Sequence, residues 1–346
     1  VYNRDVRAIL AENCFSCHGF DQKTREAGLR LDTADGSTAV LESGSAGIVP
    51  GKPDDSELVQ RILSTDHSTL MPPPESGKQL TPEQKNILKA WIAQGAEYQK
   101  HWAFIPPAKT EPPTADSEGA IQHNAVDAFI QDRLKQVGLT PSPAADPVTL
   151  MRRVCLDLTG LPPTIAEVDA FLKAFEQNPE MSYSEHVDRL LQSPHYGERW
   201  GRWWLDQARY ADSNGYSVDG PRSIWKYRDW VVNALNEDQP FDQFTIDQLA
   251  GDLLPNATVA QQVATGFHRN TPINQEGGID PEQFRIDSVF DRVATTGTVW
   301  LGLTIGCCQC HDHKFDPIKH DEYYQFFAFF NQQDEPSLTV YPPEVD

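Results

Sequence analysis

Cys14-Phe15-Ser16-Cys17-His18 lies near the start of the chain, and Cys307-Cys308-Gln309-Cys310-His311 repeats the same Cys-x-x-Cys-His pattern near its end. Each copy supplies two thiols that can form thioether bonds to the vinyl groups of a haem. The imidazole that directly follows the second thiol can become the fifth ligand of the iron. The two motifs therefore predict two covalently bound haem c groups, held by Cys14, Cys17, His18, Cys307, Cys310 and His311.

Zinc is the alternative, because structural zinc sites also use pairs of cysteines, but such sites need four ligands. No second pair of this kind lies near Cys14, so the first motif favours haem. The second motif is surrounded by four candidate zinc ligands: Cys307, Cys310, His311 and His313. A zinc knuckle in place of the second haem therefore stays open.

The length and charge of the chain narrow its class. A chain of 346 residues is long for one compact core and suits two domains. Its formal net charge of −21 and its pI near 4.8 argue against nucleic acid as a partner, because phosphates would be repelled. A basic redox partner protein would approach this surface easily. No run of 18 apolar residues is present, so no segment is expected to span a membrane.

The chain opens at Val1 without a methionine or a signal peptide, which suggests that a leader has been removed. Covalent haem attachment normally takes place outside the cytoplasmic membrane, so we expect an exported, periplasmic protein. Two cysteines, Cys155 and Cys308, are not used by the motifs. They could pair in an oxidising compartment, but the apolar neighbours of Cys155 favour a small buried side chain there.

Residues 1–100 carry the parts of a small helical haem-binding domain. An opening helix presents Val6, Ile9 and Leu10 at near-helical spacing and runs into the first motif. A closing helix begins at Thr81-Pro82-Glu83-Gln84, a capping box with proline in the first turn, and continues with one apolar face. We expect the two helices to pack on each other and against the edge of a haem.

Met71 is the predicted sixth ligand of the first haem iron, and it lies in Leu70-Met71-Pro72-Pro73-Pro74. Proline restricts the backbone, so this loop is stiff and suited to holding a thioether over an iron. The chain has only three methionines, and this one lies in a loop rather than on an apolar stripe. Ligation by His18 and Met71 predicts a comparatively high reduction potential, whereas the nearby rival His67 would lower it.

Prolines and small polar residues mark residues 101–123 as a semi-rigid linker. Residues 124–346 form the predicted second domain, in which helical signals dominate. These are an amphipathic segment over residues 125–137, an N-cap at Asp146 and a capping box that begins at Thr164. The predicted fold is therefore mostly α, with a small cytochrome c-like domain followed by a larger, irregular all-α haem-binding domain.

Aromatic residues cluster at two places in the second domain. Trp200, Trp203 and Trp204 fall on one face of a predicted helix. An aromatic core is the simpler interpretation, and a haem wall or an electron route is the functional one. The phenylalanines after the second motif are expected in a buried final helix: Phe326, Phe327, Phe329 and Phe330.

These motifs together resemble a known family. Leu70-Met71-Pro72-Pro73, with the first haem motif, is similar to the planctomycete-specific cytochrome C domain. The rest resembles the domain of unknown function usually fused to it, through Gly266-Phe267-His268-Arg269-Asn270, Asn274-Gln275-Glu276-Gly277-Gly278, Phe284-Arg285, Asp291-Arg292-Val293 and residues 295–304 and 307–318. The resemblance covers nearly the whole chain and implies haem and export. Larger members carry a third, C-terminal domain, so it also implies a fragment or a short form.

The second domain concentrates polar residues upstream of its motif: His268, Arg269, Glu276, Arg285, Asp291 and Arg292. Three uses stay open. Pairs between arginine and carboxylate could fix loops and neutralise haem propionates. His268 could be the sixth ligand of the second haem iron. Alternatively, that position is open, and His268 or Glu276 acts as a general acid or base on a substrate at the iron.

Other potential ligands are weaker. His313 lies two residues after His311, so we expect it to hydrogen-bond a propionate or the loop that ends at Asp316-Pro317. The remaining weak candidates are His320, Met151 and Met181.

We therefore expect an exported dihaem c-type cytochrome that carries single electrons between a donor and an acceptor. In the alternative, the chain is a haem oxidoreductase, peroxidase-like or carbohydrate-oxidising, with the second haem as active site and the Met71-ligated haem as electron relay. Its substrate would be a small molecule or a carbohydrate, the latter suggested only by the setting of the resembled family. A binding module with one haem and a zinc knuckle is the third interpretation.

Overall fold

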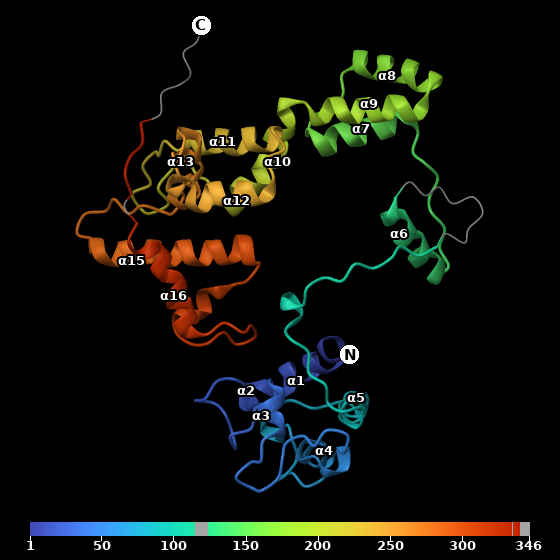
Figure 1. Cartoon of the computed structure of the whole chain (residues 1–346), viewed down its shortest axis with the longest axis vertical. Helices are drawn as coiled ribbons and strands as arrows, with labels where there is room; N and C mark the ends of the chain where they lie inside the picture. The colour runs from blue at the N-terminus through green and yellow to red at the C-terminus, as the bar shows by residue number, and fades with distance from the viewer. Residues whose placement is uncertain (115–123, 334, 340–346) are drawn as a thin grey trace. The chain divides into compact units, whose positions relative to one another are not determined.

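The computed structural model describes residues 1–114, 124–333 and 335–339. Helices make up 57% of the chain, and Figure 1 shows them distributed along its whole length. In the described ranges, β structure is limited to two isolated bridges, Val40 with Ala46 and Ser213 with Pro221. The predicted mostly α fold is confirmed.

The chain divides into two compact units. Unit 1 combines Val1–Thr110 with Ile305–Gln325, and unit 2 combines Glu111–Thr304 with Phe326–Asp346. The segment that carries the second motif therefore groups with the first motif in unit 1, although the sequence placed it in the second domain. Of the predicted linker, residues 115–123 lie outside the described residues, and its start contains a short 3-10 helix, η4 (Trp102–Phe104).

Unit 1 is built from short helices around one apolar core. They are η1 (Tyr2–Val6), α1 (Arg7–Asn13), α2 (Phe15–His18), α3 (Ala34–Thr38), η2 (Pro53–Asp55), α4 (Glu57–Leu63), η3 (Pro74–Ser76) and α5 (Pro82–Ala93). The predicted capping box of α5 is present, because Thr81 and Gln84 bond each other's backbone N–H. Leu10 of α1 and Leu88 and Ile92 of α5 are fully buried in the shared core.

The second-motif segment of unit 1 begins with η7 (Ile305–Gln309), and it continues into α16 (His320–Asn331). Arg7 donates a hydrogen bond to the backbone carbonyl of Phe315 at 2.8 Å. His101 lies 3.1 Å from the carboxylate of Asp316. These contacts join the segment to residues far away in the sequence.

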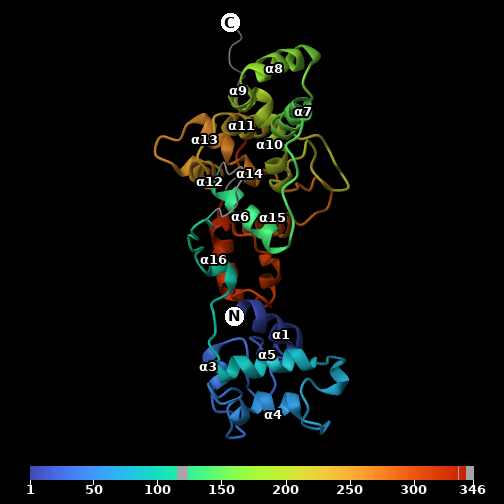
Figure 2. The same cartoon turned by 90° about the vertical axis from the view of Figure 1, so that its right-hand side faces the viewer.

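Two helical clusters of unit 2 have separate cores. The helices of this unit are α6 (Ala125–Gln136), α7 (Pro147–Leu158), α8 (Ile165–Gln177), α9 (Pro179–Leu191), α10 (Pro194–Gln207), α11 (Trp225–Asn236), α12 (Phe241–Ala250), η5 (Gly251–Leu253), α13 (Val259–Ala264), α14 (Gly266–Arg269), α15 (Pro281–Thr296) and η6 (Gly297–Leu301). The predicted caps at Asp146 and Thr164 are both present. The first cluster is α7, α8 and α9, which lie side by side in Figure 1 and Figure 2.

Cys155 lies in the core of this first cluster and is 3% exposed, as predicted for a small buried side chain. Its sulfur lies 3.3 Å from Nε2 of His186. Cys308 is also buried and also free, and it belongs to the other unit. The described structure therefore contains no disulfide between them.

The second cluster packs α10 against α11, with Tyr227, Val231 and Phe267 fully buried between them and their neighbours. The predicted Trp stripe is split. Trp204 packs on this core, whereas Trp200 and Trp203 are 41% and 51% exposed.

The final helix is less buried than the sequence suggested. Phe327 and Phe330 are buried, but Phe329 is 74% exposed, so the prediction was wrong for Phe329. It falls on the face of α16 opposite Phe327, where helical geometry turns the side chain to solvent. Among the described helices, none combines the length and the apolar character needed to cross a membrane.

Candidate haem sites and the cavity of unit 2

The first motif forms a single helical turn. The N–H groups of Cys17 and His18 donate to the carbonyl of Cys14 at 3.1 and 2.8 Å, so Cys14 is the N-cap of α2 and Cys17 and His18 lie on it. The chain then folds back, and the N–H of Leu31 donates to the carbonyl of His18 at 2.8 Å. Cys14 packs against the core while Cys17 is exposed. The motif is thus anchored on one side and open on the other.

Burial shifts the pKa values of two side chains of this motif, Cys14 and His18. It raises the pKa of the Cys14 thiol to about 12, and the charge of Lys78 offsets part of this rise. Burial also lowers the pKa of His18, with a further decrease from Arg61. The ring's Nδ1 is buried without a hydrogen bond of normal geometry, although the backbone of Glu26 faces it. A neutral imidazole has the lone pair that iron ligation needs, so the residues fit haem c.

Met71 lies in the same part of unit 1. Its N–H donates to the carbonyl of Arg61 at 3.2 Å, and the charge of Arg61 acts on His18. Met71 is half-buried, whereas the rival ligand His67 is exposed. Ligation of the first iron by Met71 stays a prediction.

The second motif is more open than the first. Cys307, Cys310 and His311 are exposed, and the N–H of Cys310 donates to the carbonyl of Cys307 at 3.3 Å. Nδ1 of His311 lies 2.7 Å from the carbonyl of Asp312. Because a carbonyl only accepts, Nδ1 carries the proton and Nε2 keeps its lone pair, as in most histidines that bind a metal. These residues also fit a haem c group.

His313 stabilises the loop after this motif, which is one of its two predicted roles. The N–H of Asp316 donates to its Nδ1 at 2.8 Å, and the N–H of Phe315 does so at 3.3 Å. Nδ1 is therefore an acceptor, and its 3.3 Å approach to the Asp316 carboxylate is not an ion pair. Within the described ranges, no three His, Cys, Asp or Glu side chains gather in metal-binding geometry.

A short segment of unit 1 is bonded to the first motif, because the N–H of Leu31 donates to the carbonyl of His18. Arg30 pairs with Asp32 at 2.5 Å, and the pKa of Arg30 is raised mainly by Asp32. The charge of Asp312, which directly follows His311, adds to this rise.

His268 and Glu276 belong to unit 2, so neither compact unit gathers them with the second motif. His268 is 6% exposed and contacts the rings of Phe267 and Phe330 at 5.2 and 5.0 Å. Burial, with the charges of Arg292 and Arg209, lowers its pKa to about 3. Glu276 lies in a loop in which its N–H bonds the side chain of Asn274 at 2.8 Å.

The weaker ligand candidates have ordinary surroundings. Met151 is fully buried in the core of α7–α9, and Met181 is 56% exposed. The ring of His320 contacts that of Tyr324 at 5.0 Å.

Pairs between arginine and carboxylate are present in unit 2. The interpretation in which such pairs fix loops requires them. Arg209 pairs with Asp291, and Arg285 pairs with Glu282 at 2.8 Å. Glu335 contacts both Arg269 and Arg292. The sequence offered no signal for Glu335, because only the folded chain brings it to these arginines.

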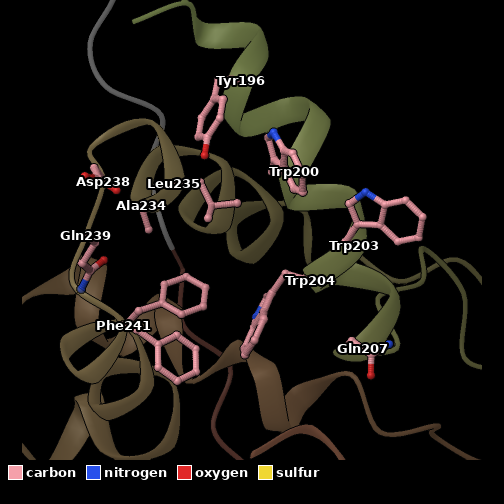
Figure 3. A pocket seen from close by; sticks show the side chains of 11 residues that line it. Tyr196, Trp200, Trp203, Trp204, Gln207, Ala234, Leu235, Asp238, Gln239 and Phe241 are labelled. Carbon is pink, nitrogen blue, oxygen red and sulfur yellow. The ribbon is translucent and has the colours of Figure 1, made fainter. Parts of the chain in front are cut away.

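Unit 2 also has an aromatic cavity of about 360 Å³ between α10, α11 and the start of α12. Its lining includes Tyr196, Trp200, Trp203, Trp204, Gln207, Asp238, Gln239, Phe241 and Phe244. Trp204 faces Phe241 across it in Figure 3, with the ring centroids 6.5 Å apart. The Trp204 indole is held in place by a 2.7 Å hydrogen bond to buried Gln248. Helical spacing pointed to the tryptophans, but no sequence pattern pointed to the side chains opposite them.

Comparison with known families agrees with the resemblance seen in the sequence. Residues 14–75 match the family described as Planctomycete cytochrome C, and residues 125–335 match PSCyt2, described as a protein of unknown function (DUF1549). The first match includes Cys14, Cys17, His18 and Met71, and the second includes Cys307, Cys310 and His311. Searches of curated proteins and of solved structures found no match.

Proposed function

The chain belongs to the PSCyt2 (DUF1549) family and carries a planctomycete cytochrome C domain, and we propose that it is a dihaem c-type cytochrome. Haem c would supply one-electron oxidation and reduction at each motif. The proposed role is to carry single electrons between a donor and an acceptor. The observation that carries this proposal is the pair of Cys-x-x-Cys-His motifs, whose four thiols are all free.

Each proposed ligand has a defined task. Cys14 and Cys17 would hold the haem through thioether bonds, and His18 and Met71 would be the ligands of its iron. Buried Cys14 anchors this group to the core of unit 1.

At the second motif, Cys307 and Cys310 would hold a haem through thioether bonds. His311 would supply Nε2 as an iron ligand, because its Nδ1 proton is held by the carbonyl of Asp312.

Placement of both motifs in unit 1 supports transfer of an electron from one to the other within the chain. The acidic composition favours redox partners with a basic surface. Export to the periplasm is part of the proposal, because covalent attachment normally takes place outside the cytoplasmic membrane.

A haem oxidoreductase is the second candidate. The aromatic cavity of unit 2 is the observation that supports it, because its volume falls in the range of small-molecule sites. A carbohydrate or another small molecule would then be the substrate.

Haem content tests the proposal. The exported, haem-loaded chain is compared with Cys14→Ala/Cys17→Ala and with Cys307→Ala/Cys310→Ala, using an alkaline pyridine spectrum and metal analysis. We expect two haems in the parent chain and one in each double variant. Unchanged haem content in the second variant, or one zinc and one haem in the parent, would refute the dihaem proposal. Carbon monoxide binding by the reduced protein would favour the oxidoreductase, because it needs an open or weakly held iron position.

A further inference from the structure

Five basic side chains converge in unit 2: Arg209, Arg222, Arg269, Arg292 and His268. They come from the turn after α10, the loop before α11, α14 and α15. Arg222 donates to the carbonyl of Arg269 at 3.4 Å and to that of Thr271 at 2.8 Å, which joins the loop to α14.

Two members of the cluster are buried, and its hydrogen-bonding capacity is incompletely used. His268 and Arg292 are 6% and 5% exposed. Both ring nitrogens of His268, Nε of Arg292, Nε of Arg222 and two guanidinium nitrogens of Arg209 are buried without a hydrogen-bond partner. Burying such groups unsatisfied is costly, so a core that serves stability alone avoids them. A site completed by a ligand explains them.

Glu335 shows which chemical group this cluster accepts. One of its carboxylate oxygens contacts Arg269 and the other contacts Arg292. It lies after the end of α16, in a segment without regular structure, and its side chain is 40% exposed. Among the described residues, no other carboxylate pairs with Arg269 or Arg292. Buried Arg292 and partly exposed Arg269 thus depend on an irregular segment for their counter-ion.

We propose that this arginine cluster is a binding site for the carboxylate group of a ligand, and that Glu335 occupies it as a displaceable internal substitute. The bridging geometry fits a planar carboxylate, whose two oxygens each meet one guanidinium. The unpartnered nitrogens of His268 and Arg209 remain for the rest of the ligand. This inference does not depend on haem at either motif.

Removal of the internal carboxylate tests the proposal. In Glu335→Gln, Arg269 and Arg292 lose their counter-ion, so the unfolding temperature of unit 2 falls. Sodium acetate should restore it in a saturable way, while sodium chloride of equal ionic strength should not, because bound ligand stabilises the folded state. By calorimetry, Glu335→Gln should bind acetate at least tenfold more tightly than the parent chain. Glu282→Gln is the matched control, because it removes a carboxylate from exposed Arg285 and should leave acetate affinity unchanged.

Three outcomes would overturn the proposal. In the first, acetate raises the unfolding temperature of Glu335→Gln no more than chloride does. In the second, Arg269→Gln in the Glu335→Gln background leaves the effect of acetate unchanged. Sulfate or inorganic phosphate acting more strongly than acetate would assign the cluster to tetrahedral anions instead. Arg269 is suited to this test because it is partly exposed, so its variant is expected to fold. Haem content is measured in parallel, so a failure here leaves the cytochrome proposal intact.

Discussion

Two glycines of α10, one turn apart, should respond to alanine in opposite directions. At Gly197 a Cβ would lie 2.3 Å from the carbonyl oxygen of Val232 and 2.7 Å from the side chain of Asn236, both on α11. At Gly201 the nearest atoms are side-chain carbons at 3.4 to 3.8 Å, which are ordinary contacts. The same substitution therefore clashes at one position and fills space at the other.

The magnitudes follow from these distances. Carbon and oxygen atoms normally stay about 3.3 Å apart, so Gly197→Ala must push α10 and α11 apart by about 1 Å. Overpacking of this kind costs about 1–3 kcal/mol, and it also disturbs the 2.7 Å hydrogen bond from Gly197 N–H to Asn236. With about 1 kcal/mol for the disturbed hydrogen bond, and after the gain of about 1 kcal/mol in helix propensity, we expect a net loss of about 2 kcal/mol. Gly201→Ala has the gain without the clash, so we expect about 1 kcal/mol of stabilisation.

Urea unfolding followed by tryptophan fluorescence measures both variants. Six of the eight tryptophans lie in unit 2, namely Trp200, Trp203, Trp204, Trp225, Trp230 and Trp300, so the signal reports mainly on that unit. Effects of the same sign, or a Gly197→Ala variant as stable as the parent, would refute the packing of α10 on α11 described above.

Three further predictions concern other parts of the chain. Gln248→Met should destabilise unit 2 by about 2 kcal/mol, because buried Gln248 accepts hydrogen bonds from Trp204 and Tyr227 at 2.7 Å and both donors lose this acceptor. Adding Tyr227→Phe should recover part of the lost stability. Strictly additive effects of the two substitutions in urea unfolding would contradict this coupling. Met71→Ala should lower the reduction potential of the first haem by about 0.1 V or more, within the ~0.8 V that axial ligands span. An unchanged potential and spectrum would mean that Met71 is not a ligand of the iron. The pKa of Glu167 is lowered to about 2 by the backbone N–H of Thr164 and by Arg189, so its ionised form stabilises the fold above about pH 4.5 and this contribution disappears as the pH falls toward 2. Glu167→Gln should therefore lower the unfolding temperature slightly at pH 7 and not at pH 2, and an equal effect at both values would argue against the ionised cap.

Local sequence rules predicted the elements well where neighbouring residues set the structure. The capping boxes at Thr81 and Thr164 and the N-cap at Asp146 formed as expected, because each involves atoms within three residues of one another. Amphipathic spacing likewise found the buried side chains of α5. Phe329 was misjudged, because a run of aromatic residues does not reveal which helix face finds a partner.

The two Cys-x-x-Cys-His motifs and their resemblance to a planctomycete cytochrome are properties of the sequence alone, since haem attachment needs only that spacing. Only the tertiary structure placed residues 305–325 in unit 1 with the first motif, because hydrogen bonds such as Arg7 to Phe315 join positions far apart in the chain. The tertiary structure alone also brings Glu335 to Arg269 and Arg292 of the arginine cluster. Burial and long-range charge decide such sites, and both depend on the complete fold rather than on neighbours in sequence.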